Sequence, residues 1–382
     1  MNDHVPDELT PAGRDLRAYT DELRPQHPVV RNVLGEWVLL RHDLVTEAAL
    51  DHDRFSNAVS RHLHVPNGLD GTEHTAMREA LDPFLSVEAL APYVADFERI
   101  ASDLMDSLPR GETLDAVSQI GATFAVRGQS VWLGWPPEFE DRLAAWVAEN
   151  REATRSSDRS RTRQVAEDFD AIIHAVLAST RLQPAGGGPD VTTQLASTTV
   201  DGRPLTEPEI VSILRNWTGG DLGSIALCVG VLVYFLATHP EAQTRLRAGV
   251  PDDELDAVID EILRIDDPFV SNTRVTTCPV QVGGADIPAG ARVKLNWTSA
   301  NRDEGTFVDP DAVDASGNAA KNLVYGLGKH ACPGRLLSTI DLRIATRALL
   351  ASTTSITLAP DAPAEREVAP VGGWRRVPVI LC

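Results

Sequence analysis

The sequence predicts a mainly helical fold with small β-sheets attached, of class α+β, and three observations support this prediction. Apolar residues recur at helical spacing through much of the first half of the chain, and residues 206–238 form one long apolar stretch of the same kind. Beyond residue 270, β-branched residues alternate with polar ones between Gly and Pro turns, which is typical of short hairpin strands. The stretches expected to be helical are 73–85, 92–108, 119–134, 138–154, 163–180, 206–238 and 254–266.

The long helix has recognisable ends. Thr206 and Glu209 form an S/T-x-x-E capping box, and the helix is expected to end before the His239–Pro240 pair. A helix this long and this apolar must be buried along much of its length. Elsewhere we expect strands within 274–297 and 375–381, a surface loop at 183–190 and a flexible N-terminal segment at 1–20, all within one domain, 1–382.

Composition limits the class of function. The formal net charge of −20 over 382 residues argues against nucleic acid as a partner, because phosphate binding needs a basic face. The N-terminus lacks an apolar signal-peptide core, and the longest apolar run, 223–237, is shorter than the about 20 residues that span a bilayer. The four cysteines form no C-x-x-C pair. We therefore expect a cytoplasmic protein without a membrane segment.

The stretch YGLGKHACPG, residues 325–334, carries the most specific motif in the chain. It resembles the cysteine loop of the cytochrome P-450 family, whose pattern is aromatic-G-x-G-x-H-x-C-x-G, and the resemblance runs from about residue 30 to the C-terminus. It implies the fold of that family, in which a long central helix lies over a haem held by the cysteine loop. The residues that fill the pattern are Tyr325, Gly326, Gly328, His330, Cys332 and Gly334.

The chemistry of this loop agrees with the resemblance. Cys332 lies just before an expected helix, whose N-terminal N–H groups favour an anionic sulfur. The alternatives are a buried structural cysteine and a zinc site, but zinc would need further Cys or His ligands, and His330 is the only one nearby. The resemblance implies that Cys332 binds the iron of haem b and that Tyr325, Gly326 and Gly219 lie close to the macrocycle.

Other implied haem contacts come from charged residues. His74 and Arg78 lie one helical turn apart and resemble the family's H-x-x-x-R pair, which binds haem propionates. Arg274 and His330 match two further propionate ligands. A charge-assisted hydrogen bond to a buried carboxylate is worth about 1.5–3 kcal/mol. Each of these residues, taken alone, could equally be a solvated surface charge.

Glu261 and Arg264 resemble the family's E-x-x-R motif, whose implied role is a buried ion pair that braces the protein near the cysteine loop. The spacing alone is weak evidence, since exposed Glu/Arg pairs are common on helices. An arginine of the family usually joins this pair, and Ala312 stands at the expected position. The sequence therefore leaves the third partner of the pair open.

The segment TGGDLG, residues 218–223, aligns with the family's oxygen-activating segment. Gly219 and Asp221 match it, but Leu222 stands where the family has a threonine. The resemblance implies that Asp221 relays protons to dioxygen, with Ser224, a water or a substrate hydroxyl in place of the missing threonine. The alternatives are a chemistry without ordinary proton delivery, or an acid that faces solvent or pairs with an arginine.

The implied pocket mixes apolar and polar side chains, which suits a hydrophobic ligand with a few polar groups. The resemblance implies a monooxygenase that inserts one oxygen atom from O2 into a small hydrophobic organic substrate, in bacterial secondary metabolism or catabolism. One alternative is a non-hydroxylating oxidation such as C–C or C–N coupling, and another is a haem-binding sensor or non-catalytic partner protein. The expected pocket residues are Asn67, Leu69, Thr218, Leu222, Val270, Ser271 and Trp374.

Soluble bacterial members of the family take electrons from a ferredoxin or flavodoxin, which docks on the face from which the cysteine reaches the iron. Lys329 and Arg335 are the basic residues close to Cys332, and they are either docking contacts or solvated charges. We expect a monomer that uses such a redox partner.

Overall fold

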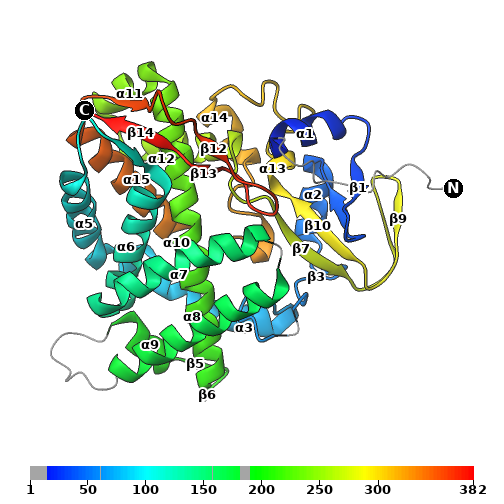
Figure 1. The fold of residues 1–382 in the computed structure, drawn as a ribbon. Coiled ribbons are helices and arrows are strands. Elements are labelled where there is room, and N and C mark those ends of the chain that lie inside the picture. Colours follow the sequence, from blue (N-terminus) through cyan, green and yellow to red (C-terminus); the bar gives the residue numbers. More distant parts are fainter. Residues whose placement is uncertain (1–14, 61, 157, 181–189) are drawn as a thin grey trace.

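The structure is a computed structural model, and it describes residues 15–60, 62–156, 158–180 and 190–382. Most helices lie together on one side, and the main sheet lies on the other with α1 and α2 against it (Figure 1). The expected surface loop at 183–190 falls almost wholly outside the described residues.

The element bounds follow much of the predicted pattern, but the sequence does not predict the strands β1 to β3 near the N-terminus. The helices are α1 Leu16–Leu23, α2 His42–Leu50, α3 Gly71–Leu81, α4 Val87–Leu90, α5 Val94–Ser107, α6 Thr123–Leu133, α7 Glu140–Ser156, α8 Arg159–Thr180, α9 Val191–Ala196, α10 Glu207–Thr238, α11 Pro240–Arg247, α12 Asp252–Ile265, α13 Trp297–Ala300, α14 Ala315–Asn318 and α15 Arg335–Ser352. The strands are β1 Val29–Arg31, β2 Trp37–Leu39, β3 Phe55–Ser56, β4 Thr113–Asp115, β5 Thr199–Val200, β6 Arg203–Pro204, β7 Ser271–Thr276, β8 Val280–Val282, β9 Ala285–Ile287, β10 Arg292–Asn296, β11 Ile356–Leu358, β12 Glu365–Arg366, β13 Trp374–Arg376 and β14 Pro378–Leu381. Short 3₁₀ turns lie at Asp82–Leu85, Ala91–Tyr93, Pro137–Phe139, Ala319–Lys321 and Gly328–His330, and Ala116–Ala122 is a π-helix.

The predicted hairpin region, 274–297, contains β7 to β10, so this prediction is confirmed. Its longer strands join N-terminal strands in one sheet of order β1-β2-β10-β7-β3. In that sheet β10 runs parallel to β2 and antiparallel to β7, with Val293 opposite both Trp37 and Arg274. The sheet therefore holds Arg274 at a fixed place beside the helical part of the protein.

Helix α10 begins at the predicted place, because the Thr206 hydroxyl accepts from the Glu209 N–H and the Glu209 carboxylate accepts from the Thr206 N–H. The helix is long and apolar enough to cross a membrane by length and composition, but 61% of its most apolar window is buried inside the protein. It is therefore a core helix. The helix runs without interruption from Glu207 to Thr238, so its glycines do not open it.

Two glycines let the π-helix approach α10 closely. A Cβ on Gly121 would meet the Ala226 carbonyl oxygen at 2.7 Å, and a Cβ on Gly230 would meet the Val117 side chain at 2.6 Å. Both distances are shorter than a carbon atom tolerates. Close packing at these two points fixes how α10 crosses the middle of the protein.

Residues 16–20 correct one expectation. The sequence predicts a flexible segment through residue 20, but α1 starts at Leu16, and the Asp15 side chain accepts a hydrogen bond from the Arg17 N–H at its start. Thr20 has no exposed surface, and the Arg24 guanidinium beyond it donates to the backbone of Ser299 at 2.9 Å. The helix is ordered because it packs against the main sheet. Residues 1–14 lie outside the described part of the chain.

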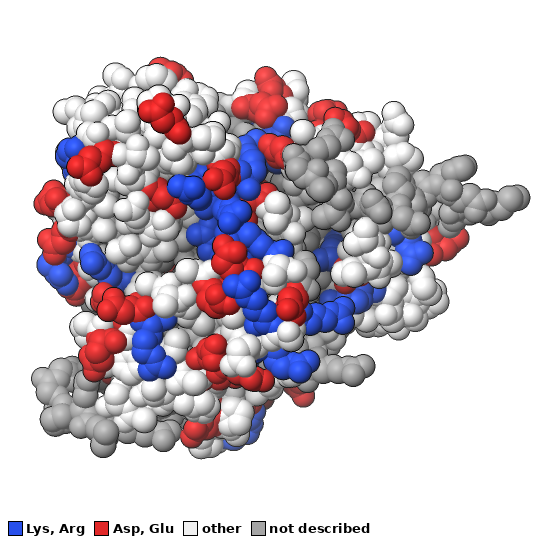
Figure 2. Space-filling model, in the orientation of Figure 1, with Lys and Arg blue, Asp and Glu red and all other residues white. Residues whose placement is uncertain are grey.

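Although the net charge of the protein is −20, arginine side chains form a cluster on the face seen in Figure 2. Arginine side chains gather over α7, β12 and β13, and carboxylates lie among them. Arg151 and Arg155 of α7 both pair with Glu367, whose side chain is 1% exposed, and Arg376 pairs with Glu365. These pairs tie α7 to the C-terminal hairpin.

Candidate active site

The cysteine loop, residues 325–334, turns sharply before α15. Gly326 and Gly328 have φ values of +68° and +75°, a left-handed conformation that favours glycine. The Cys332 N–H donates to the Tyr325 carbonyl at 2.8 Å and closes the loop. Burial raises the pKa of the Cys332 thiol, while the Gly334 N–H, which points at the sulfur, lowers it.

Cys332 and α10 border an open space. The Cys332 residue keeps exposed surface although burial raises its thiol pKa, so the sulfur lies inside the protein beside a gap. On α10, a Cβ added at Gly220 or Gly223 would meet nothing within 4 Å. The charge of Asp221 also raises the pKa of the Cys332 thiol.

Two histidines lie side by side next to this space. The His74 ring on α3 is 4.0 Å from the His330 ring in the cysteine loop, and both side chains are buried. The His74 Nδ1 atom has no hydrogen-bond partner in the described part of the chain. Burial, with help from Arg78 and Lys329, lowers the pKa of His74 to about 4, and burial together with His74 and Arg274 lowers the pKa of His330 to about 3.

Two arginines complete this basic group. Arg274 on β7 is 6% exposed, and within the described residues no carboxylate lies within ion-pair distance of it. Burial lowers its pKa to about 10, and the charge of Asp70 offsets part of this effect. Arg78 on α3 donates to the Lys329 and Ala331 carbonyls at 3.3 and 3.2 Å and so holds the cysteine loop. His74, Arg78, Arg274 and His330, which we call the basic cluster, therefore lie together as expected.

The Glu261–Arg264 pair is fully buried beneath the loop. Two guanidinium N–H groups of Arg264 donate to the two Glu261 oxygens, each at 2.8 Å. The third partner, which the sequence leaves open, is replaced by several uncharged groups. The Asn301 and Ala312 carbonyls accept from Arg264 at 2.7 and 3.3 Å. The Asn318 amide and the Asp314 N–H donate to Glu261 at 2.7 and 3.1 Å.

The residues of the oxygen-activating segment, 218–223, lie on different sides of helix α10. Leu222 has no exposed surface and packs in the core, whereas Ser224 is half-buried on the same helix side as Gly220 and Gly223. A Cβ on Gly219 would meet the Phe169 ring at 3.2 Å, so this glycine faces the stacked aromatic rings of α7 and α8. The structure therefore places Gly220 and Gly223 at the open space, and Gly219 away from it. Ser224 lies on the same side as these two glycines, whereas Leu222 lies in the core.

Asp221 is the acid of this segment. Burial raises the pKa of its carboxyl to about 7, and the Ser338 hydroxyl, which hydrogen bonds to it, lowers this pKa. Ser338 lies on α15, one turn beyond the loop. The Ser224 hydroxyl donates to the Gly220 carbonyl and leaves its oxygen lone pairs free to accept.

The expected pocket residues are spread between the surface and the core. Asn67 is exposed and Leu69 and Ser271 are half-buried, whereas Thr218, Leu222, Val270 and Trp374 are buried. The Thr218 hydroxyl has no partner among the described residues. The Trp374 indole stacks on Tyr234 at 3.8 Å and donates to Asp266 at 3.1 Å, so it is held by packing.

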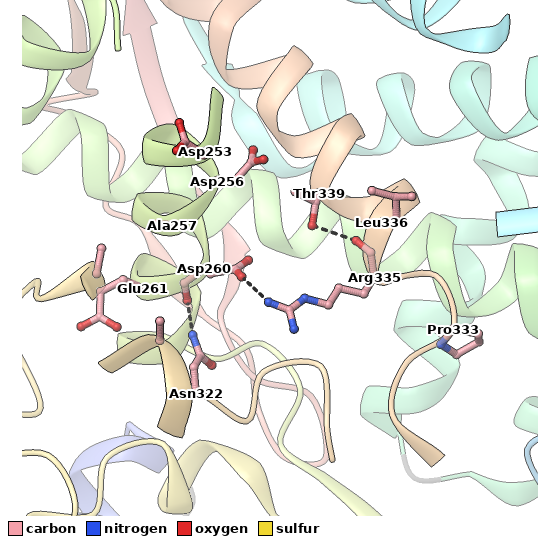
Figure 3. Close-up of a pocket in the computed structure, with 12 residues that line it drawn as sticks. Asp253, Asp256, Ala257, Asp260, Glu261, Asn322, Pro333, Arg335, Leu336 and Thr339 are labelled. Atoms are coloured by element: carbon pink, nitrogen blue, oxygen red, sulfur yellow. Dashed lines mark hydrogen bonds and ion pairs between the residues drawn. The ribbon is translucent and has the colours of Figure 1, made fainter. Parts of the chain in front are cut away.

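A hollow of about 590 Å³ lies on the other side of the cysteine loop, between α12 and α15. Figure 3 shows Arg335 reaching from α15 toward Asp260 on α12, where the two form a 3.1 Å ion pair. Burial raises the pKa of both Asp256 and Asp260. Arg335 is therefore already paired with an acid, whereas half-buried Lys329 donates to the Gly71 carbonyl at 3.2 Å and pairs with no carboxylate among the described residues.

Sequence reasoning missed two residues close to this site, Ser338 and Asp341 of α15. Both lie in a stretch that reads as an ordinary amphipathic helix. Asp341 is 4% exposed and its Oδ1 atom has no partner in the described chain. An acid flanked by Ile340 and Leu342 was the available signal, since acids are rarely buried without a partner.

Comparison with known proteins agrees with this geometry. The family model for cytochrome P-450 matches residues 156–354, which is more than half of the chain. The cyclomarin C epoxidase CymV of Salinispora arenicola is 28% identical over 354 residues, covering 88% of each chain. The erythromycin C-12 hydroxylase of Saccharopolyspora erythraea is 27% identical over 94% of this chain and 92% of its own.

A solved structure extends the likeness to the whole fold. The ligand-free structure of the cytochrome P-450 TbtJ1 superposes with a TM-score of 0.86 at 27% identity, covering 98% of this chain and 99% of the other. The match includes the mainly helical architecture and its small sheets. With a cysteine loop, a basic cluster and a central helix arranged around one space, the chain belongs to the cytochrome P-450 family and is a cytochrome P-450 monooxygenase.

Proposed function

We propose that this enzyme is a haem-thiolate monooxygenase that inserts one oxygen atom from O2 into a small hydrophobic organic substrate of bacterial secondary metabolism or catabolism. Membership of the family implies a haem cofactor, O2 and a redox partner. One observation carries the proposal: the cysteine loop brings Cys332 and His330 next to the His74 ring and the Arg78 guanidinium, in a group of residues that fits a haem with its carboxylates. An anionic sulfur ligand and a proton donor are what this chemistry needs.

The residues present fit haem b. Its two carboxylates need cationic or N–H donors once they are buried, and the basic cluster offers Arg274 without an acid partner and His74 with an unpartnered ring nitrogen. Burial and the neighbouring cations lower the pKa values of His74 and His330 even though the Asp70 carboxylate, 3.4 Å from the His330 ring, acts to raise them. Two carboxylates placed there would raise the pKa of each histidine.

Each protein group has a definite task. When bound, the haem supplies an iron whose thiolate ligand favours cleavage of the O–O bond. Cys332 holds the iron, and the Gly334 N–H stabilises the anionic sulfur. Gly220 and Gly223 leave room on the α10 side because they carry no Cβ.

Asp221 and Ser224 are the groups that donate and accept protons or hydrogen bonds on the α10 side. With a pKa of about 7, the Asp221 carboxyl is partly protonated at neutral pH and can release and regain a proton there. Ser224 offers a hydroxyl oxygen as acceptor on the open side of α10, in the role that the sequence leaves unfilled at Leu222. This arrangement supports oxygen insertion over an oxidation that needs no proton delivery.

The substrate and the electron donor belong to the same proposal. CymV and the erythromycin hydroxylase are named for cyclomarin C and erythromycin, and we infer a natural-product substrate of similar apolar character for this enzyme. We also infer one domain, 1–382, that works as a cytoplasmic monomer with a ferredoxin or flavodoxin. The donor docks on the cysteine-loop face, where half-buried Lys329 has no carboxylate at ion-pair distance among the described residues.

The proposal is tested with isotopically labelled dioxygen. Compounds that displace water from the haem iron are first found by a binding-spectrum screen, then incubated with the enzyme, a surrogate ferredoxin, its reductase and NADPH. We expect one labelled oxygen atom in each product molecule, and none when the label is in the water. A product that carries no label from dioxygen would instead identify a coupling reaction and contradict the proposal.

A further inference from the structure

Asn216 of α10 lies on the side of the helix that borders the open space. It precedes Gly220 by one helical turn and Gly223 by two, so the three residues share one side of α10. A Cβ added at either glycine would meet nothing within 4 Å. Asn216 is half-buried, whereas Trp217 and Thr218, which follow it on other sides of the helix, are buried. The Asn216 amide therefore stands in the wall of the space, one turn before the glycines.

One hydrogen bond fixes the orientation of this amide. Its Nδ2 group donates to the Val65 carbonyl at 2.6 Å. Because a carbonyl oxygen only accepts hydrogen bonds, the contact identifies the end of the amide that faces Val65 as the nitrogen. The Oδ1 atom, an acceptor with two lone pairs, therefore lies on the other side of the amide group from Val65.

The loop that carries Val65 is held on α10 at a second point. The Ser212 hydroxyl, one turn before Asn216, accepts from the Val65 N–H at 2.9 Å and donates to the Leu63 carbonyl at 3.1 Å. Val65 itself is 2% exposed and packs in the main core. The partner of the Asn216 Nδ2 group is thus rigidly placed, and the amide is oriented before a ligand arrives. A ligand that uses this amide loses little affinity to the ordering of the side chain.

Two ionisable side chains lie near the Asn216 amide, and neither uses up its oxygen. Arg215 donates two hydrogen bonds of 2.7 Å to Asp170 of α8 and is held away by them. Burial lowers the pKa of His64, and a hydrogen bond to Asn216 acts to raise it. A histidine N–H occupies one lone pair of an amide oxygen. The second lone pair of Asn216 Oδ1 is therefore available to a ligand in the space.

We propose that Asn216 determines specificity by accepting a hydrogen bond from a hydroxyl or N–H group of an otherwise apolar substrate. The inference rests on the proposed function, in which the substrate is oxidised beside Gly220 and Ser224. An α-helix rises about 1.5 Å per residue, so these two residues lie about 6 and 12 Å along α10 from Asn216. The donor group of the substrate therefore lies about 6–12 Å from the carbon atom that is oxidised.

A series of N-alkylimidazoles tests this inference through binding alone. The imidazole nitrogen binds the haem iron and shifts the Soret band, and the far end of the alkyl chain carries either a hydroxyl or a methoxy group. With the haem-loaded wild type, we expect the hydroxyl compound to bind about 3–10-fold more tightly than its methoxy partner, the usual worth of one hydrogen bond. This preference should appear only when the chain reaches about 6–12 Å and should be absent for a two-carbon chain.

Two variants separate the acceptor from the anchoring of the loop. Asn216→Leu removes the amide and should bind the two members of each pair with equal affinity. Ser212→Ala is the matched control, because it removes two hydrogen bonds to the same loop and leaves the Asn216 amide in place. It should keep the preference for the hydroxyl compound. Loss of the preference in both variants would show that only the anchoring of the loop matters, and would overturn the inference.

The remaining outcomes separate the inference from the proposed function. Imidazole compounds that cause no Soret shift would contradict haem binding, on which the proposed function depends. Soret shifts with equal affinity for the hydroxyl and methoxy compounds at every chain length would overturn the inference alone. A preference that persists in Asn216→Leu would assign the hydroxyl group to another residue and would overturn it as well.

Discussion

Replacing Arg264 with Leu is expected to lower the free energy of unfolding by about 3–5 kcal/mol, because it leaves Glu261 buried without its counter-ion. Both side chains are at most 2% exposed, and the two groups make a two-pronged pair at 2.8 Å. Asn318 and the Asp314 N–H would still donate to Glu261, but they carry no positive charge. Urea unfolding of haem-loaded protein gives the difference as a shift of the midpoint.

An ion pair whose two partners are both exposed offers a matched control. Arg99 pairs with Asp96 of α5 at 2.9 Å, and their side chains are 58% and 49% exposed. Arg99→Leu should therefore change the unfolding free energy by less than about 1 kcal/mol, as is usual for exposed ion pairs. Equal losses in the two variants would show that burial of the Glu261–Arg264 pair does not matter, and would contradict the bracing role of that pair.

Replacing Asp221 with Asn is expected to reduce product formation by about 10²–10⁴-fold, the usual contribution of a positioned proton donor. Electrons should still be consumed, since the haem site is untouched, and product per electron should fall. The wild type should also lose coupling as the pH rises through about 7, the pKa to which burial raises this carboxyl, because the deprotonated acid cannot donate. Asp221→Asn should lack that pH dependence.

Two further measurements test whether the loss of product is specific to the Asp221 carboxyl. Leu222→Val alters the neighbouring residue, which packs in the core, and should cost stability without changing product per electron. Asp221→Asn should gain stability relative to the wild type as the pH rises from about 4 to about 7, because over that range the folded wild type keeps a proton that the unfolded chain releases. Unchanged coupling in Asp221→Asn would remove Asp221 from the proton path.

Local rules in the sequence account for much of the fold. The capping box of Thr206 and Glu209 defines the start of α10, and the alternation after residue 270 marks β7 to β10. The order of the main sheet, β1-β2-β10-β7-β3, could not be predicted in this way. It joins strands more than 200 residues apart, and no local pattern encodes which long-range pairing has the lowest free energy.

The candidate site, like the fold, could be predicted from the sequence only in part. The cysteine loop and the basic cluster can be found from the sequence because each motif couples residue type to spacing. The side on which Leu222 and Ser224 lie could have been inferred from helical phase, since Ser224 follows Gly220 by one turn and Leu222 does not. The role of Asn318 and the Ala312 carbonyl depends on how separate elements pack, which spacing along the chain does not reveal.

The central claim is that Cys332 supplies an anionic sulfur to a haem, and one measurement tests it most directly: the carbon monoxide difference spectrum of the reduced protein. We expect a strongly red-shifted Soret band in the wild type and in Cys278→Ala, a free cysteine on another part of the chain. We expect Cys332→Ala to lack the band. A wild type without the red-shifted band, or a Cys332→Ala variant that keeps it, would contradict thiolate ligation by Cys332.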